Sequence, residues 1–126
     1  MQQRAGSHPR LGVGRQRLAT ALAAVQAMTA TMINYLMAAQ QDPTELYKVG
    51  LGSVRFLITV GDLVIGWKLL QQAEIAAQRT RHRRPRGRKF YEGKVANALF
   101  FTKTILPEVS ASRAVIDDVD NDIMTV

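Results

Sequence analysis

Apolar residues recur every three or four positions along much of this chain. Over about residues 17–40 they are Leu18, Leu22, Val25, Met28 or Thr29, Met32 and Leu36. This spacing places them on one face of an α-helix, and the surrounding Ala, Leu, Met and Gln are strong helix formers. Residues 1–16 hold three glycines, a proline and no apolar period. They are expected to form a disordered, basic N-terminal arm.

A second helix is predicted over residues 43–78. Asp42 is suited to cap its first free amides, and Pro43 fits the first helical position. Glu45 stands at the third position, as in a capping box. The apolar stripe of this helix is predicted to consist of Leu46, Gly50, Ser53 or Val54, Leu57, Val60 or Gly61, Val64, Trp67 and Leu70, with Phe56 and Leu63 to one side. So broad a face indicates contact with more than one neighbouring helix.

Four glycines interrupt this second helix, at Gly50, Gly52, Gly61 and Gly66. Each costs up to about 1 kcal/mol of helix stability relative to alanine. Close approach of another backbone would offset that cost, so we expect the helix to lie centrally against its partners. A strand over 56–60 is the weaker alternative, because the flanking period is helical.

Further helices are predicted at about 89–106 and 108–118, separated by Pro107, which kinks or ends a helix. The acidic tail after Asp117 is expected to fray. The predicted fold is therefore all-α. It is an antiparallel up-and-down bundle of three helices, or four with the short last piece, in a single helical domain over 17–126.

The net charge of +7 is concentrated in one run, residues 79–89, which hold seven basic residues and no acidic one. Without this run, ten basic residues balance ten acidic ones. Pro85, Gly87 and like-charge repulsion predict a solvated basic loop over 79–88. The same charges could neutralise phosphates, so binding to nucleic acid or to an anionic surface through 79–89 is an alternative function. Without interleaved aromatic residues, such binding would be non-specific.

Residues suited to catalysis are scarce. The chain has no cysteine, which excludes disulfides and thiolate chemistry. Its histidines, His8 and His82, fall in segments expected to be disordered, so no metal site is predicted. Gly50-Leu51-Gly52 only partly matches a dinucleotide-binding motif and lies within a helical period. No phosphate loop or nucleophile elbow is present, so we do not expect this chain alone to be an enzyme.

The apolar stretch from Val49 to Leu70 is long enough to cross a bilayer, but it contains Arg55, Asp62 and Lys68. Each would cost about 2.5–3.5 kcal/mol near the bilayer centre, so no transmembrane segment is predicted. Arg55 and Asp62 are seven residues apart and share one helix face. Because buried charges need partners, we expect each to reach an adjacent helix or another domain rather than a ligand.

Amphipathic aromatic residues are expected to pack in the core or at an interface. Together with the glycines and the charged pair they form the predicted packing or interface set, which comprises Tyr47, Gly50, Arg55, Gly61, Asp62, Gly66, Trp67 and Tyr91.

Several motifs resemble the extra C-terminal domain of large bacterial acyl-CoA dehydrogenases. They are YKVGLGSVRFL at 47–57, VGDL at 60–63 and Gly66-Trp67 in the second helix, and FYEGKVA at 90–96 with the stretch from Phe100-Phe101 to Leu106-Pro107 in the next. Asp120-Asn121 and Met124 are similar to the tail of that domain. The long-helix motif is the most specific of these.

The resemblance implies a non-catalytic, all-helical domain that packs on, or helps assemble, an FAD-dependent acyl-CoA dehydrogenase of fatty acid oxidation. Such enzymes oxidise acyl-CoA with FAD and a glutamate base, and neither the flavin-contacting segments nor that base has a counterpart here. The expected partners are the dehydrogenase core domains or another copy of the chain, in the cytoplasm. Only a packing role carries over, to Gly61, Asp62, Gly66 and Trp67. The arginine run and residues 1–17 depart from the family, which suggests a truncated or frame-shifted reading of a longer gene.

Overall fold

The fold is all-α, as predicted, in a computed structural model that describes residues 9–80 and 85–125. Its elements are α1 (Pro9–Ala38), a 3-10 turn (Pro43–Glu45), α2 (Leu46–Thr80), α3 (Pro85–Thr104), α4 (Pro107–Asp117) and a second 3-10 turn (Asp122–Met124). The segment 56–60, for which a strand was the weaker alternative, is helical.

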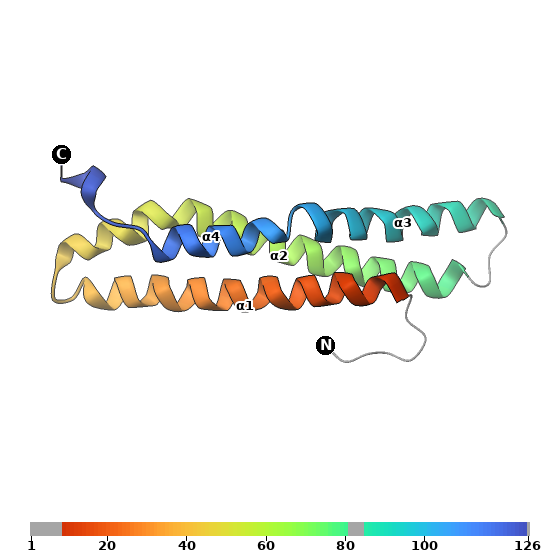
Figure 1. The fold of residues 1–126 in the computed structure, drawn as a ribbon, viewed down its shortest axis with the longest axis horizontal. Coiled ribbons are helices and arrows are strands. Elements are labelled where there is room, and N and C mark those ends of the chain that lie inside the picture. The colour runs from red at the N-terminus through yellow and green to blue at the C-terminus, as the bar shows by residue number, and fades with distance from the viewer. Residues whose placement is uncertain (1–8, 81–84, 126) are drawn as a thin grey trace.

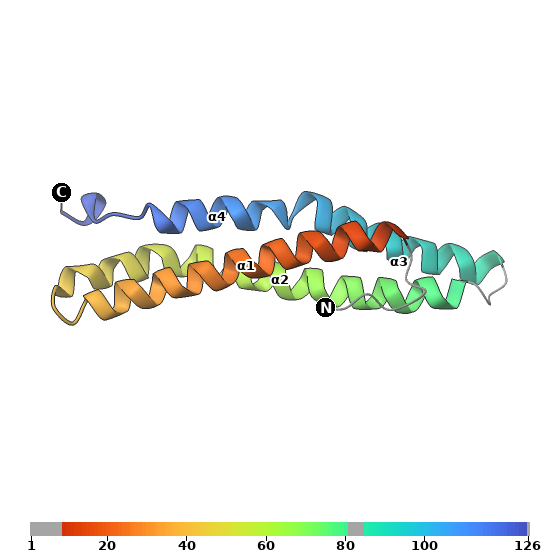
Figure 2. The ribbon, with the colours of Figure 1, turned by 60° about the horizontal axis from the view of Figure 1, so that its bottom comes forward.

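The four helices make an elongated bundle of three rods. α1 and α2 run antiparallel, and α3 and α4 follow one another along a single line beside them (Figures 1 and 2). This third rod is interrupted between Thr104 and Pro107, where the amides of Ile105 and Leu106 both donate to the carbonyl of Phe101. Pro107 then opens α4, so the prediction that it ends the third helix is confirmed.

α1 begins eight residues earlier than predicted, at Pro9. The expectation that 9–16 are disordered was therefore wrong, and residues 1–8 lie outside the described part of the chain. The two glycines in this segment obscured a regular period. The buried residues of α1 are Leu11, Gly14, Leu18, Ala21, Ala24, Val25 and Met28. Their spacing of three and four residues carries the buried face of the helix back to its first turn.

The basic run is more helical than predicted. α2 continues to Thr80 and α3 starts at Pro85, so 79–80 and 85–88 are helical rather than loop, and 81–84 lie outside the described residues. Pro85 opens a helix instead of breaking one, because its missing N–H costs nothing in the first turn. Arg79, Arg88 and Lys89 are exposed.

Small residues form the inner face of α2. They are Gly52, Thr59, Gly66, Ala73 and Ala76, accompanied by Leu70. A Cβ added at Gly66 would lie only 3.1 Å from Cδ2 of Leu106, and one at Gly52 3.2 Å from Sδ of Met32. Neighbouring helices therefore approach this face closely, as two of the four glycines suggested.

The predicted apolar stripe of α2 faces largely outward, which corrects the sequence interpretation. Leu70 is fully buried, whereas Leu57 is 72% exposed and Val54 is 67% exposed. Leu46, Val64 and Trp67 of the same stripe are also exposed. The small residues take the inner positions because they permit close packing, and this leaves the larger apolar side chains outside the chain's own core.

The helix predicted to start at Pro43 opens with a 3-10 turn over 43–45, and the α-helix itself begins at Leu46. Asp42 caps this turn as predicted, accepting bonds from the Thr44 amide at 3.1 Å and the Thr44 hydroxyl at 2.6 Å. Glu45 does not complete a capping box, because it pairs with Nζ of Lys48 at 2.9 Å. The described part of the tail, up to Thr125, is held in place rather than frayed, since Nδ2 of Asn121 donates to the Thr44 carbonyl at 3.1 Å.

Candidate functional site

The most prominent surface feature is an apolar face on α2 that the rest of the described chain leaves uncovered. Its exposed residues are Leu51, Val54, Leu57, Ile58, Val64 and Ile65. Contiguous exposed apolar surface marks interaction sites rather than ordinary solvent-facing protein. This face is flanked by two grooves, one against α4 and one against α1.

The groove between α2 and α4 combines apolar walls with charge. It has a volume of about 400 Å³ and is lined by Leu51, Val54, Arg55, Ile58, Thr59, Asp62, Glu108, Val109 and Ser112. Burial raises the pKa of the Asp62 carboxyl, and the like charge of Glu108 raises it further. Within the described residues, no ion pair engages Arg55 or Asp62. The partner expected on an adjacent helix is therefore missing from the described residues, and a partner on another domain stays a prediction.

The groove between α1 and α2 is almost purely apolar. It has a volume of about 180 Å³ and is lined by Leu18, Leu22, Leu63, Val64 and Trp67. Trp67 is 43% exposed, and Nζ of Lys68 lies 4.3 Å from the centroid of its ring. An indole that is exposed beside aliphatic side chains in the separate chain is typical of residues that become buried anchors when a protein interface forms.

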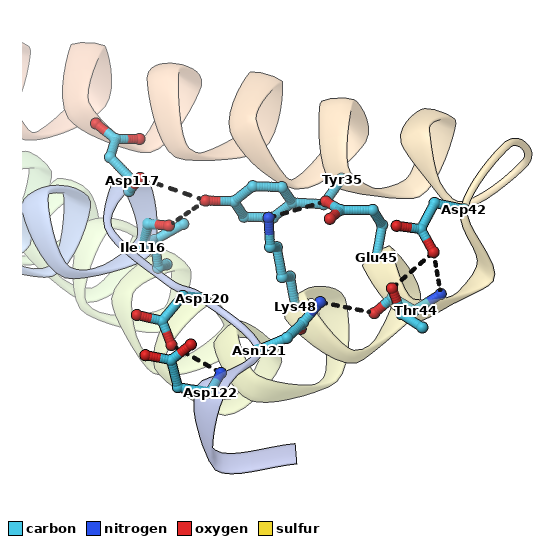
Figure 3. A network of polar contacts seen from close by, with 10 residues as sticks. All are labelled: Tyr35, Asp42, Thr44, Glu45, Lys48, Ile116, Asp117, Asp120, Asn121 and Asp122. Carbon is cyan, nitrogen blue, oxygen red and sulfur yellow. Dashed lines mark hydrogen bonds and ion pairs between the residues drawn. The ribbon is translucent and has the colours of Figure 1, made fainter. Parts of the chain in front are cut away.

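A polar network ties the C-terminal end of the chain to the turn between α1 and α2 (Figure 3). The Tyr35 hydroxyl donates to the Ile116 carbonyl at 2.7 Å, and the Thr31 hydroxyl donates to Oδ1 of Asp117 at 2.8 Å. Burial raises the pKa of the Tyr35 phenol, with Lys48 opposing it. The network fixes α4 and the tail against α1, so its role is structural. Sequence reasoning missed it, because its members show no shared period.

Comparison with known proteins identifies the chain's relatives. A family model described as "Acetyl-CoA dehydrogenase C-terminal like" matches residues 1–126. The chain belongs to this family. It is 57% identical over 116 residues to the broad-specificity linear acyl-CoA dehydrogenase FadE5 of Mycobacterium tuberculosis. It is also 34% identical over 120 residues to the 3-methylmercaptopropionyl-CoA dehydrogenase of Ruegeria pomeroyi.

The alignments cover most of this chain but little of either relative. They include 91% and 90% of the chain, and in each case 19% of the relative. The chain therefore spans about a fifth of the length of these acyl-CoA dehydrogenases. The family resemblance drawn from the motifs is confirmed, and it concerns the C-terminal region of these enzymes. The family model also matches residues 1–17, so the expectation that this segment departs from the family was wrong.

The predicted packing residues of this family domain separate into three groups in the structure. Gly66 is buried under Leu106, and Tyr91 packs against the hydrophobic core with its ring edge-on to Phe90. Arg55, Asp62 and Trp67 line the two grooves. Tyr47 is exposed, and a Cβ added at Gly50 or Gly61 would meet no atom within 4 Å.

Metal binding and membrane insertion have little support in the described part of the domain. Residues 9–80 and 85–125 contain no cluster of three or more His, Cys, Asp or Glu side chains able to hold a metal ion. Pro9–Ala38 and Pro43–Arg79 are long and apolar enough to cross a membrane by length and composition alone. Core helices of water-soluble proteins meet the same criterion, so this finding is weak evidence for a span.

Proposed function

We propose that this chain is a non-catalytic helical domain of an FAD-dependent acyl-CoA dehydrogenase of fatty acid oxidation, acting in the cytoplasm. Its role is to pack on the part of the enzyme that binds flavin and acyl-CoA. The family membership and the C-terminal position of the matched region in both relatives support this proposal.

The apolar groove between α1 and α2 is the observation that carries the proposal. Trp67 and Leu22 keep part of their surface exposed there although both are large and apolar. Covering an apolar surface gains roughly 25 cal/mol per Å², so a protruding apolar side chain of the dehydrogenase core is a favourable occupant. The groove offers no carboxylate, histidine or hydroxyl for chemistry, which fits a packing role.

A complementation experiment tests this function. The chain would be co-expressed with the Mycobacterium tuberculosis relative lacking the C-terminal region that this chain matches. We expect the two polypeptides to co-purify, and the complex to retain more flavin and more acyl-CoA dehydrogenase activity than the shortened enzyme alone. Val64→Glu places a charge in the groove and should weaken this association by about tenfold or more, which corresponds to about 1.4 kcal/mol.

The matched control is Ile75→Glu, a substitution of the same kind at an exposed position of α2 that does not line the groove. It should leave co-purification and activity unchanged. If both folded polypeptides remain separate at high concentration, the proposed function is wrong. If the two substitutions weaken co-purification equally, the contact does not lie in this groove, and the role assigned to the groove is wrong.

A further inference from the structure

The outward face of α2 has the repeat of a coiled coil. Leu51, Ile58 and Ile65 recur every seven residues, and Val54 and Gly61 follow the first two by three residues. The four large side chains of this set are exposed, and Ile58 is 60% exposed. A spacing of three and four residues sustained on one helix face is the pattern by which two helices pair along a seam. No helix of the described chain occupies this seam, since its residues are open to solvent.

The charges beside the seam are self-complementary. Arg55 and Asp62 directly follow Val54 and Gly61, so they lie one heptad apart on the same flank. In an antiparallel pair of identical helices, a two-fold axis brings such positions opposite each other twice. Arg55 has no acidic partner within the described residues, while Asp62 faces only the like charge of Glu108 across its groove. An arginine from outside would pair with Asp62, and a carboxylate from outside would pair with Arg55.

Gly61 is explained by the same arrangement. A glycine inside a helix makes that helix less stable than alanine would, and an added Cβ at Gly61 would meet no atom within 4 Å. Packing inside this chain therefore does not require a glycine there, in contrast to Gly66, whose added Cβ would crowd Leu106. A second helix lying over Gly61 could approach closely because no side chain intervenes.

We propose that α2 pairs with α2 of a second copy of this chain, antiparallel and two-fold symmetric, with Arg55 of each copy beside Asp62 of the other. In this register Ile58 lies over Gly61 of the second copy, and Val54 lies opposite Ile65 of the second copy. Each copy contributes the same patch, as a closed two-fold contact requires.

This pairing is distinct from the proposed docking on the dehydrogenase core, which uses the groove on the α1 side of α2. The two contacts can therefore fail separately. Charge complementarity between Arg55 and Asp62 favours a second copy over a lipid surface, because burying an unpaired charge in hydrocarbon is costly. It also favours a second copy over an unrelated helix, which would need matching charges of its own.

The test reverses each of the two charges in a separate variant and measures the molar mass of the protein by light scattering across a dilution series. The unchanged chain is expected to dimerise as its concentration rises. Arg55→Glu and Asp62→Arg each place like charges opposite one another twice, so each should weaken self-association by about tenfold or more. An equimolar mixture of the two variants should recover the dimer, because both acidic side chains of one variant then face arginines of the other. Circular dichroism of each variant checks that these substitutions leave the helices intact.

Several outcomes would overturn the pairing. One is a monomer at every concentration of the unchanged chain. Another is a dimer that neither substitution weakens, or a mixture of variants that stays monomeric. Binding to phosphatidylcholine vesicles in place of self-association would assign the face of α2 to lipid. Co-purification with the shortened dehydrogenase tests the proposed function separately and does not depend on the outcome of this experiment.

Discussion

Replacing Leu106 by alanine is expected to lower the free energy of unfolding by about 2–5 kcal/mol. Leu106 is fully buried at the interruption between α3 and α4, and its side chain lies over Gly66 of α2. Removing it leaves a cavity that Gly66 has no side chain to fill. The cost should therefore fall toward the upper end of that range. Chemical denaturation followed by circular dichroism measures it.

Two further variants sharpen this prediction. Leu57→Ala, an equal truncation at a largely exposed position of α2, should change stability by less than about 0.5 kcal/mol in the monomer. Adding Gly66→Ala to Leu106→Ala should recover part of the loss, because the freed space accepts the new methyl group and alanine favours the helix. Equal losses at Leu106 and Leu57, or no recovery in the double variant, would contradict this packing.

Leu11→Ala is expected to cost about 2–5 kcal/mol as well. Leu11 is 0% exposed and belongs to the hydrophobic core. Close by, an added Cβ at Gly14 would come within 2.9 Å of Leu70, so this end of α1 packs tightly on α2. The ion pair between Nη1 of Arg15 and Oε1 of Glu74, at 3.1 Å, joins the same two helices. Thermal and chemical unfolding should both report the loss.

This substitution also separates the structure from the simpler sequence interpretation. A disordered arm over 1–16 would make Leu11→Ala neutral, whereas a packed first turn makes it costly. Val13→Ala, at an exposed position of the same turn, is the control and should be close to neutral. If Leu11→Ala leaves the free energy of unfolding unchanged, the packed first turn of α1 is contradicted and the expectation of a disordered arm is supported.

The features predicted well from sequence were those set by local chemistry. Asp42 and Pro43 act within one turn of the chain, and Pro107 removes a backbone donor wherever it stands. The helix boundaries near them were therefore predicted to within about three residues. Glycine was ambiguous, because Gly14 inside a packed helix looks the same in sequence as glycine in a flexible arm.

The orientation of α2 could not be read from hydrophobicity. Side-chain size, rather than apolar character, decides which residues face the neighbouring helices here. Thr59 is buried with its hydroxyl bonded to the Arg55 carbonyl at 2.7 Å, while Leu57 two residues earlier is exposed. A stripe of large apolar residues marks the core only when its partner lies in the same chain. Contacts such as that of Tyr35 with Ile116 join distant residues and leave no periodic signal.

The central claim is that α2 has one face closed by its own chain and one face closed by a second copy. The chain contains no cysteine, so single cysteines can be placed along α2 and their reaction rates with a thiol reagent compared. In dilute solution Val54→Cys and Ser53→Cys should react fast and the buried Thr59→Cys slowly. When the protein is concentrated, the reaction rate of Val54→Cys should fall because the second copy covers the seam. The rate of Ser53→Cys should not change, because Ser53 lies off the seam. A fast Thr59→Cys, or a Val54→Cys rate independent of concentration, would contradict the account.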